Sequence, residues 1–322
     1  ITETKDDLSG INDVINREYY IKKQHFLRHH NIIRNEVNTV ETCRISGEDV
    51  KAALANTDQV VFEVTEKCNL KCKYCGFGEL YTGYDQRNGN NFDLENAKIV
   101  LAFLKDIWNS ELNTANKKPI YFGFYGGEPL LNFDLVKRIV EYIKTLELNK
   151  NVFYFNMTTN GTLLHKHMDY LVENNFLLAV SIDGDHIHNQ YRVFHDGKSS
   201  SSLVEKNLLL LRKRFPDFYN NNVGISSVFH NKSSYLQINK YILDKFGKKP
   251  NISELSKTCI ANEDGEIKNL YGSVSEVYNS EISCNAEVKN YHDFYSDSVK
   301  AIIKGYNKNT FDNYSSLLYN IK

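Results

Sequence analysis

Five runs of β-branched and aromatic residues alternate along this chain with segments of helical periodicity, which limits the folds it can adopt. Most runs are nearly continuously apolar, as expected for strands that are covered on both faces. Strands that alternate with helices at this spacing form parallel βαβ units. The runs cover about residues 59–65, 119–125, 152–158, 177–182 and 222–229, and a weaker sixth lies near Asn251–Leu255. The pattern predicts an α/β fold, a partial (β/α)6 TIM-like barrel.

Amphipathic segments between these runs predict the helices. Asp93 stands where it can cap the first helix, and the other helices repeat apolar residues at helical spacing. The apolar faces are Leu94, Ala97, Leu101, Leu104 and Trp108; Leu135, Ile139, Val140 and Ile143; Leu163 to Val172; Leu203, Leu208 and Leu211; and Tyr235, Ile238, Ile242 and Phe246. Together these elements place one barrel domain in residues 51–257.

Composition excludes several functional classes. The chain has 322 residues, enough for one large domain and a smaller one, and a formal net charge of −1, which argues against electrostatic binding of nucleic acid. Apolar residues make up 41% of the chain. No run of about 18 or more apolar residues occurs, so we expect no membrane span and no signal peptide. Six cysteines, three of them clustered, indicate metal chemistry in a reducing compartment, and we expect a cytoplasmic protein.

The clustered cysteines, Cys68, Cys72 and Cys75, follow the first predicted strand directly. Three thiolates at this spacing can bind three irons of a four-iron, four-sulfur ([4Fe-4S]) cluster and leave the fourth iron without a protein ligand. Such clusters usually take four cysteines, and structural zinc sites also close with four ligands. The loop therefore indicates a metal centre with an open position. The alternative is a zinc knuckle that Cys43 or a histidine completes.

A glycine-rich loop, Tyr125–Pro129, follows the second predicted strand. Gly126 and Gly127 allow the backbone to approach a ligand closely. The following Glu128 presents a carboxylate beside backbone carbonyls, and such acceptors suit an ammonium group with its three donors. A double glycine by itself is also a common turn.

Polar residues end the third predicted strand in Thr158–Thr162. The side chains of Thr159 and Asn160 can bond a ribose or a carboxylate, and the Asn-Gly step allows a sharp exit from the strand. An ordinary turn between a strand and a helix would have the same composition.

The fourth predicted strand ends in a further polar group. Ser181 and Asp183 are expected to point the same way because side chains alternate along a strand. Arg192 carries a planar fork that suits a carboxylate. Asp183, Asp185 and His186 are candidates for accepting a proton during a reaction, although most such loop residues are only solvated.

The Cys-x3-Cys-x2-Cys pattern, with Tyr74 before its third cysteine, resembles the signature of the radical S-adenosylmethionine (radical SAM) enzymes. The resemblance covers about residues 50–255. It is strongest, in Phe62–Cys75 and Phe124–Asn132, to the SPASM-type peptide maturases of ribosomally made, post-translationally modified peptides (RiPPs). It implies the same partial barrel, a [4Fe-4S] cluster and S-adenosylmethionine as cofactor.

The resemblance also implies a role for each motif. The cluster would bind to Cys68, Cys72 and Cys75, and its open iron would chelate the amino and carboxylate groups of the methionine moiety. One electron passed to the sulfonium would give methionine and a 5′-deoxyadenosyl radical. The cofactor contacts implied are Tyr74 beside the cluster, Gly126, Gly127 and Glu128 at the amino group, Thr159 and Asn160 near the ribose and carboxylate, Ser181, and Arg192 at the carboxylate.

The expected function is that of a peptide maturase. The radical would abstract hydrogen from a residue of a precursor peptide (leader plus core), leading to a crosslink or related modification, with a reductant such as flavodoxin or ferredoxin as electron donor. An alternative within the family is modification of an active-site residue of a protein, as in anaerobic sulfatase-maturating enzymes. An alternative of a different class is a zinc-stabilised peptide-binding protein that catalyses nothing.

The two ends of the chain depart from the barrel pattern. Residues 1–50 occupy the position of a winged-helix-like domain that recognises a leader peptide in related maturases, and we expect a remnant of it. Residues 258–322 form an irregular or helical extension, with Cys259 and Cys284 as structural thiols. Related maturases continue into a cysteine-rich domain with auxiliary clusters. After Cys75 only two lone cysteines remain, so we expect either that this domain is absent from the chain or that the protein functions without it.

Overall fold

The computed structural model describes residues 22, 45–78, 81, 87–114, 118–148, 152–255 and 270. The chain divides between Lys51 and Ala52 into two units, and the description below concerns the second unit. Its strands are β1 (Gln59–Thr65), β2 (Ile120–Gly126), β3 (Phe153–Thr159), β4 (Leu177–Ser181), β5 (Val223–Phe229) and β6 (Pro250–Glu254). The helices are α2 (Gly47–Ala55), α3 (Leu94–Trp108), the 3-10 helix η2 (Pro129–Asn132), α4 (Phe133–Lys144), α5 (Leu164–Glu173), α6 (Ser201–Arg214), α7 (Pro216–Asn222) and α8 (Tyr235–Phe246).

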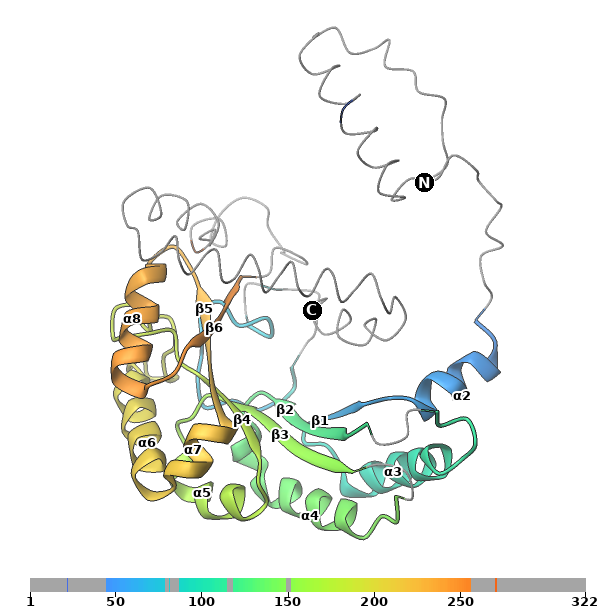
Figure 1. Ribbon diagram of the computed structural model, residues 1–322. Coiled ribbons are helices and arrows are strands. Elements are labelled where there is room, and N and C mark those ends of the chain that lie inside the picture. Colours follow the sequence, from blue (N-terminus) through green and yellow to red (C-terminus); the bar gives the residue numbers. More distant parts are fainter. Residues whose placement is uncertain are drawn as a thin grey trace, which may run out of the picture. The chain divides into compact units, whose positions relative to one another are not determined.

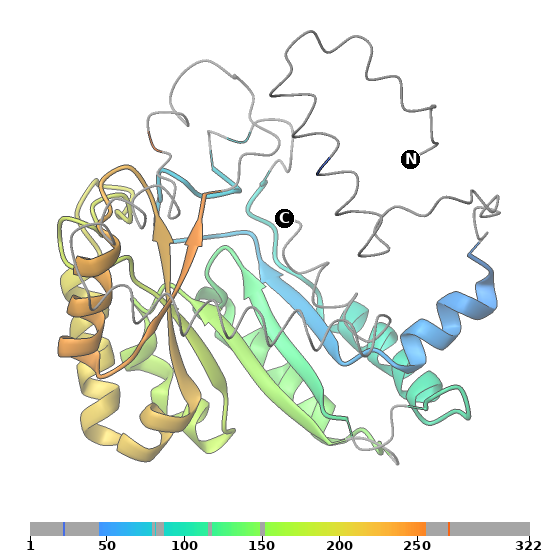
Figure 2. The same cartoon turned by 45° about the horizontal axis from the view of Figure 1, so that its top comes forward.

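The six strands form one sheet in the order β1-β2-β3-β4-β5-β6. All five pairings are parallel, and the sheet is strongly twisted (Figure 2). Each predicted run lies within one residue of an observed strand at both ends. The predicted fold class, an α/β partial barrel, is confirmed.

Helices α3 to α8 cover one side of this sheet (Figure 1). The core between the two layers contains large aromatic side chains from the strands, including Phe122, Phe124 and Phe155, and Trp108 from α3. All five apolar residues predicted for the first helix are buried, and so are all four predicted for the second. The helical periodicity in the sequence therefore identified the face of α3 and the face of α4 that pack on the sheet.

Two details of the helices differ from the expectations. Asp93 occupies the position before α3, but its side chain makes no capping hydrogen bond. Helix α6 buries Val204 and Asn207 beside Leu208 and Leu211, whereas Leu203 is only half-buried. Leu208 and Leu211 are thus buried as expected, and Val204 and Asn207 complete the buried face in place of Leu203. The side chain of Asn207 bonds the backbone of the loop after β3.

Among the described residues, the opposite face of the sheet is less buried than the expectation of strands covered on both faces implies. Val61, Tyr125 and Tyr154 on β1, β2 and β3 are exposed, whereas the adjacent residues Phe62, Phe124 and Phe155 are buried in the core. An alternating strand with one open face is typical of a sheet that lines a cleft on that side.

Local signals set the ends of helix α8. The side chain of Ser234 accepts a hydrogen bond from the backbone N–H of Gln237 at 3.3 Å, and Gly247 closes the helix in the left-handed conformation with φ +67°. Within the described part of the chain, no helix is both long and apolar enough to cross a lipid bilayer.

Burial against the sheet predicts unequal costs for two isoleucines. Ile139→Ala on α4, at a side chain that is 0% exposed, is expected to lower the free energy of unfolding by about 2–5 kcal/mol, because it leaves a cavity in the core. Ile99→Ala on α3, at a side chain that is 67% exposed, is expected to change it by no more than about 0.5 kcal/mol. Urea unfolding of both variants checks this. Equal losses would contradict the packing described above.

Candidate active site

The carboxyl ends of strands β1 to β6 surround a cleft of about 1410 Å³. Pockets for small molecules usually measure about 300–1,000 Å³, so this cleft has room for more than one small group. Four predicted site residues do not line it: Glu128, Asp183, Asp185 and His186. Those that do are Cys68, Cys72, Tyr74, Cys75, Gly126, Gly127, Thr159, Asn160, Ser181 and Arg192.

The cysteine loop reaches the cleft by pairing with a distant segment. The backbone N–H of Lys71 donates to the carbonyl of Val193 at 2.7 Å, and that of Lys73 donates to the carbonyl of Tyr191 at 3.1 Å. Leu70 and Phe194 form an isolated antiparallel bridge. The loop after β1 therefore lies beside the segment after β4.

All three cysteines are free thiols and half-buried. Burial raises the pKa of the Cys68 thiol, and it raises the pKa of the Cys72 thiol to about 12, although nearby Arg192 opposes this second shift. The sulfur of Cys68 accepts weak hydrogen bonds from the Leu70 N–H at 3.4 Å and from Asn160 Nδ2 at 3.8 Å. Thiolates in this loop would therefore need a metal to stabilise their charge.

The cysteines are not arranged as a site for a single ion. Among the described residues, no three His, Cys, Asp or Glu side chains gather closely enough to hold one metal ion, as the ligands of structural zinc do. In a four-iron cluster each cysteine binds a different iron, so the sulfurs need not converge on one point. The arrangement is compatible with such a cluster, and Cys43, considered as a fourth zinc ligand, lies outside the described residues.

Gly126 and Gly127 hold the loop after β2 directly against the backbone that enters the cysteine loop. A Cβ atom at Gly126 would lie 2.2 Å from the carbonyl oxygen of Thr65, and one at Gly127 would lie 2.2 Å from the carbonyl oxygen of Lys67. Gly126 also has a φ of +136°, which other residues rarely adopt. The double glycine is therefore needed for the two loops to meet, and it leaves backbone surface facing the cleft.

Glu128 does not present its carboxylate to the cleft. It is fully buried and accepts hydrogen bonds from the hydroxyl of Thr159 at 2.7 Å, the N–H of Asn160 at 2.7 Å and the N–H of Leu130 at 3.1 Å. Burial raises the pKa of Glu128, although these hydrogen bonds oppose the shift. The carboxylate fastens the loop after β2 to the end of β3, which argues against the expected direct contact of its side chain with an ammonium group.

Asn160 joins the end of β3 to the cysteine loop. Its Nδ2 donates to Oδ1 of Asn69 at 2.9 Å, and its Oδ1 accepts from the hydroxyl of Thr162 at 2.7 Å. Asn69 in turn donates to that hydroxyl at 2.8 Å. This amide network fixes the loop around Cys68 and leaves Thr159 and Asn160 on the wall of the cleft.

Arg192, Tyr74 and Asp183 form a buried polar group at the other wall. Nη1 of Arg192 donates to the Tyr74 hydroxyl at 3.1 Å, and that hydroxyl donates to Oδ2 of Asp183. Burial holds the pKa of Tyr74 well above its ordinary value, so the phenol keeps its proton. Asp183 is 0% exposed and also accepts from the N–H of Val228 at 2.9 Å. This position behind Tyr74 argues against the expected role of Asp183 in proton transfer.

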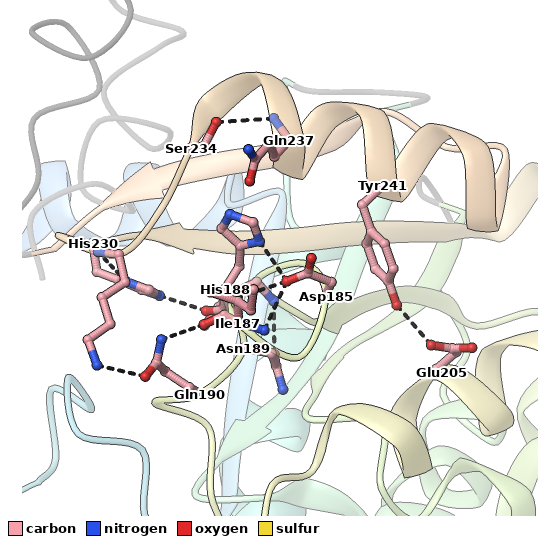
Figure 3. Close-up of polar contacts among 12 residues, drawn as sticks. Asp185, Ile187, His188, Asn189, Gln190, Glu205, His230, Ser234, Gln237 and Tyr241 are labelled. Atoms are coloured by element: carbon pink, nitrogen blue, oxygen red, sulfur yellow. Dashed lines mark hydrogen bonds and ion pairs between the residues drawn. The ribbon is translucent and has the colours of Figure 1, made fainter.

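Asp185 lies in a separate network away from the cleft lining (Figure 3). Its Oδ1 accepts from the N–H groups of Ile187 at 2.9 Å and His188 at 3.1 Å, and lies 2.7 Å from Nδ1 of His188. Burial raises the pKa of Asp185, but these hydrogen bonds outweigh it and leave the pKa lowered. The expected proton-accepting role is therefore not supported for Asp185, nor for His186, which is exposed and does not line the cleft.

Sequence reasoning missed three residues that support the site. His230 stacks on the Tyr74 ring at 6.0 Å between centroids, and burial lowers its pKa. Asn69 anchors the cysteine loop, and Nε2 of His195 lies 2.9 Å from the carbonyl oxygen of Cys68. His230 directly follows β5. The candidates predicted from sequence come from the loops after the first four strands, and applying the same rule to the fifth strand would have identified His230.

The residues of the cleft fit a cluster and an amino-acid-bearing cofactor. Nε of Arg192 is buried and has no hydrogen-bond partner among the described residues, and such a group calls for an anionic acceptor. The glycine backbone offers a close approach on the facing loop. Three thiols and several hydroxyl and amide groups complete the lining.

Comparison with known proteins gives these motifs a context. Residues 62–231 match the family model described as the Radical SAM superfamily. The radical SAM cyclopropyl synthase TigE of Paramaledivibacter caminithermalis is 26% identical over 319 residues, which cover 93% of this chain and 62% of that protein. A cysteine-type anaerobic sulfatase-maturating enzyme of Clostridium novyi is 28% identical over 164 residues, which cover 50% of this chain and 41% of that protein. The chain thus spans less than two thirds of either relative.

A solved structure shows the same fold. The native enzyme anSMEcpe, with bound AdoMet and the Cp18Cys peptide, superposes with a TM-score of 0.56 at 25% identity, over 76% of this chain and 61% of that one. This likeness agrees with the alternating sheet and helices described above.

The contact between the two loops predicts that Gly127 tolerates no side chain. Gly127→Ala is expected to lower the free energy of unfolding by about 1–3 kcal/mol and to reduce iron uptake, because its Cβ would collide with the Lys67 backbone. Gly224→Ala on β5 is the control, since a Cβ there would meet nothing nearer than the Leu178 carbonyl oxygen at 3.7 Å. Urea unfolding and iron content are measured on both. Matching values for the two variants would refute the close contact.

Proposed function

The chain belongs to the radical SAM superfamily, and from that premise we propose that it is a peptide maturase whose cluster is bound by Cys68, Cys72 and Cys75. Enzymes of this superfamily use a [4Fe-4S] cluster and S-adenosylmethionine. When bound, these groups supply a radical, made with one electron from the cluster, that removes a hydrogen atom from the substrate. The observation that carries the proposal is one cleft that joins three free thiols to Arg192 and its unpartnered Nε.

Each wall of the cleft has a distinct task in this proposal. The cysteine loop holds three irons. Arg192 binds the cofactor carboxylate, since its planar fork is suited to one. The backbone of Gly126 and Gly127 receives the amino group, and Thr159, Asn160 and Ser181 bond the remaining polar groups of the cofactor. Residues 51–257 would be the catalytic core. Residues 1–50 and 258–322, for which leader recognition and a C-terminal extension are expected, lie almost wholly outside the described part of the chain.

Two similarities support a peptide as substrate. The solved relative is described with a bound peptide beside AdoMet, and TigE, a cyclopropyl synthase, aligns with 93% of this chain. The inner face of the half-barrel is open next to the cleft and presents Tyr125 at its rim. We propose that a precursor peptide, leader plus core, lies on this face and that hydrogen abstraction leads to a crosslink or related modification. An external one-electron carrier of the flavodoxin or ferredoxin type would reduce the cluster.

The ligand assignment predicts the behaviour of a cysteine variant. Cys72→Ala is expected to lose the iron–sulfur cluster and to release no 5′-deoxyadenosine, because the cluster needs all three thiolates. The fold of the full chain should persist, since Cys72 lies in a loop. Cys284→Ala is the control and is expected to keep both properties. Iron and sulfide content after anaerobic reconstitution and chromatography of the products check this. Continued cleavage by Cys72→Ala would disprove the assignment, and tight stoichiometric zinc with no iron chemistry would favour a peptide-binding protein.

Modification of a protein's active-site residue is the second candidate, and the similarity to sulfatase-maturating enzymes favours it. The reconstituted protein can be offered two substrates in parallel: a short precursor peptide encoded beside its gene, and a peptide with a sulfatase active-site cysteine or serine. We expect a mass change in the precursor peptide alone. A mass change confined to the sulfatase peptide would replace the first proposal with the second.

A further inference from the structure

Arg192 and Asp183 are buried together but do not form a closed ion pair. Their nearest nitrogen and oxygen, Nη1 and Oδ1, are 3.9 Å apart. Arginine and carboxylate groups that hydrogen-bond directly approach to about 2.7–2.9 Å, commonly through two parallel bonds. Because Arg192 is only 8% exposed and Asp183 is 0% exposed, a direct bidentate pair would be the expected arrangement in this surrounding.

The hydroxyl of Tyr74 occupies the position between the two charges. It accepts a hydrogen bond from Nη1 of Arg192 at 3.1 Å and donates one to Oδ2 of Asp183. The other carboxylate oxygen, Oδ1, accepts from the N–H of Val228 at 2.9 Å, and the Asp183 N–H donates to Oδ1 of Asn189 at 3.0 Å. The backbone of Val228 therefore holds the carboxylate oxygen nearest to Arg192, and Asn189 holds the Asp183 N–H.

The ring that carries this hydroxyl is fixed from behind. His230 stacks on Tyr74 with an interplanar angle of 26°, and its Nε2 donates to the carbonyl of His188 at 2.8 Å. The ring of His188 is in turn held by Asp185 at 2.7 Å (Figure 3). Tyr191 packs edge-on against His230 at 4.7 Å between centroids. A chain of contacts thus keeps the Tyr74 hydroxyl between Arg192 and Asp183.

One edge of the guanidinium remains available as a result. Nε of Arg192 has no partner among the described residues although it is buried, and Arg192 lines the cleft. The Nε edge lies on the other side of the guanidinium from Nη1, so Asp183 would not occupy it directly. A closed ion pair at Nη1 would instead neutralise the guanidinium and draw it toward Asp183, so that it would compete with a second carboxylate for the same charge. The hydroxyl prevents that competition while still satisfying one guanidinium N–H.

We propose that Tyr74 is a positioning residue whose hydroxyl acts as a spacer: it stops Asp183 from closing an ion pair with Arg192 and so keeps the guanidinium open for the carboxylate of the cofactor. The inference rests on the proposed function in one respect, the assignment of Arg192 to that carboxylate. In this proposal the hydroxyl of Tyr74, the aromatic residue before the third cysteine, has a role that the ring alone could not fill.

Tyr74→Phe tests the spacer, because it removes the hydroxyl and keeps the ring. The anaerobically reconstituted variant is expected to retain its iron content but to bind S-adenosylmethionine at least about tenfold more weakly, since Asp183 can then close on Arg192. Adding Asp183→Asn to this variant removes the competing charge and is expected to restore most of the lost affinity. Equilibrium dialysis with labelled S-adenosylmethionine measures both. Unchanged affinity in Tyr74→Phe, or no recovery in the double variant, would overturn the proposal.

A second measurement on the full chain does not depend on the cofactor. If the ion pair closes in Tyr74→Phe, then Asp183→Asn should lower the urea midpoint by more in the Tyr74→Phe background than in the unaltered chain. A residue that serves only to fill space would give equal shifts, and equal shifts would count against the spacer.

The two proposals fail differently: an unaltered protein that binds no S-adenosylmethionine refutes the proposed function, whereas normal binding with no effect of Tyr74→Phe refutes the spacer alone. Arg192→Lys tests the shared assignment, since it should weaken binding with iron retained.

Discussion

Backbone contact between the loops after β1 and β2 is the constraint on which the rest of the site depends. The N–H of Gly127 donates to the carbonyl of Thr65 at 2.8 Å, and the N–H of Glu128 donates to the carbonyl of Lys67 at 2.8 Å. These bonds form only because the glycines carry no Cβ. They continue the pairing of the two strands beyond the sheet and set the direction in which the cysteine loop leaves β1. The thiols, the glycine backbone and the strand ends face one cleft for this reason.

The buried charges around the cleft also join the strands that carry them. Glu128 connects the loop after β2 to the end of β3, and Asp183 connects the segment after β4 to Val228 on β5. Tyr74 connects the loop after β1 to Asp183. Each charged group loses hydration when it is buried and regains stability only through such bonds. The carboxyl end of the half-barrel is therefore held by polar contacts, whereas the helix-covered side is held by apolar packing.

The strands could be predicted from the sequence because apolar runs that become buried also consist of residues that favour β-structure. The predicted runs lie within one residue of the observed strands. The sequence also predicted which residues line the cleft in places where a residue with suitable binding chemistry follows a strand, as in the cysteine loop and at Arg192. It did not indicate that the carboxylates of Glu128 and Asp183 are buried away from the cleft lining. Glu128 and Asp183 follow strands just as a cleft residue would, but N–H and O–H donors from Thr159, Asn160 and Val228, on neighbouring strands, hold them in place. The sequence of one strand does not show which hydrogen-bond donor from another strand will bond the carboxylate that follows it.

The open sheet has a consequence for how a long polymer could reach the cleft. The strand order runs from β1 to β6, and among the described strands these two outer ones do not pair with each other. A closed ring of strands admits a chain only through its mouth, end first. A sheet with a gap between its outer strands can instead receive a chain sideways, so that a residue far from either terminus is laid in without threading.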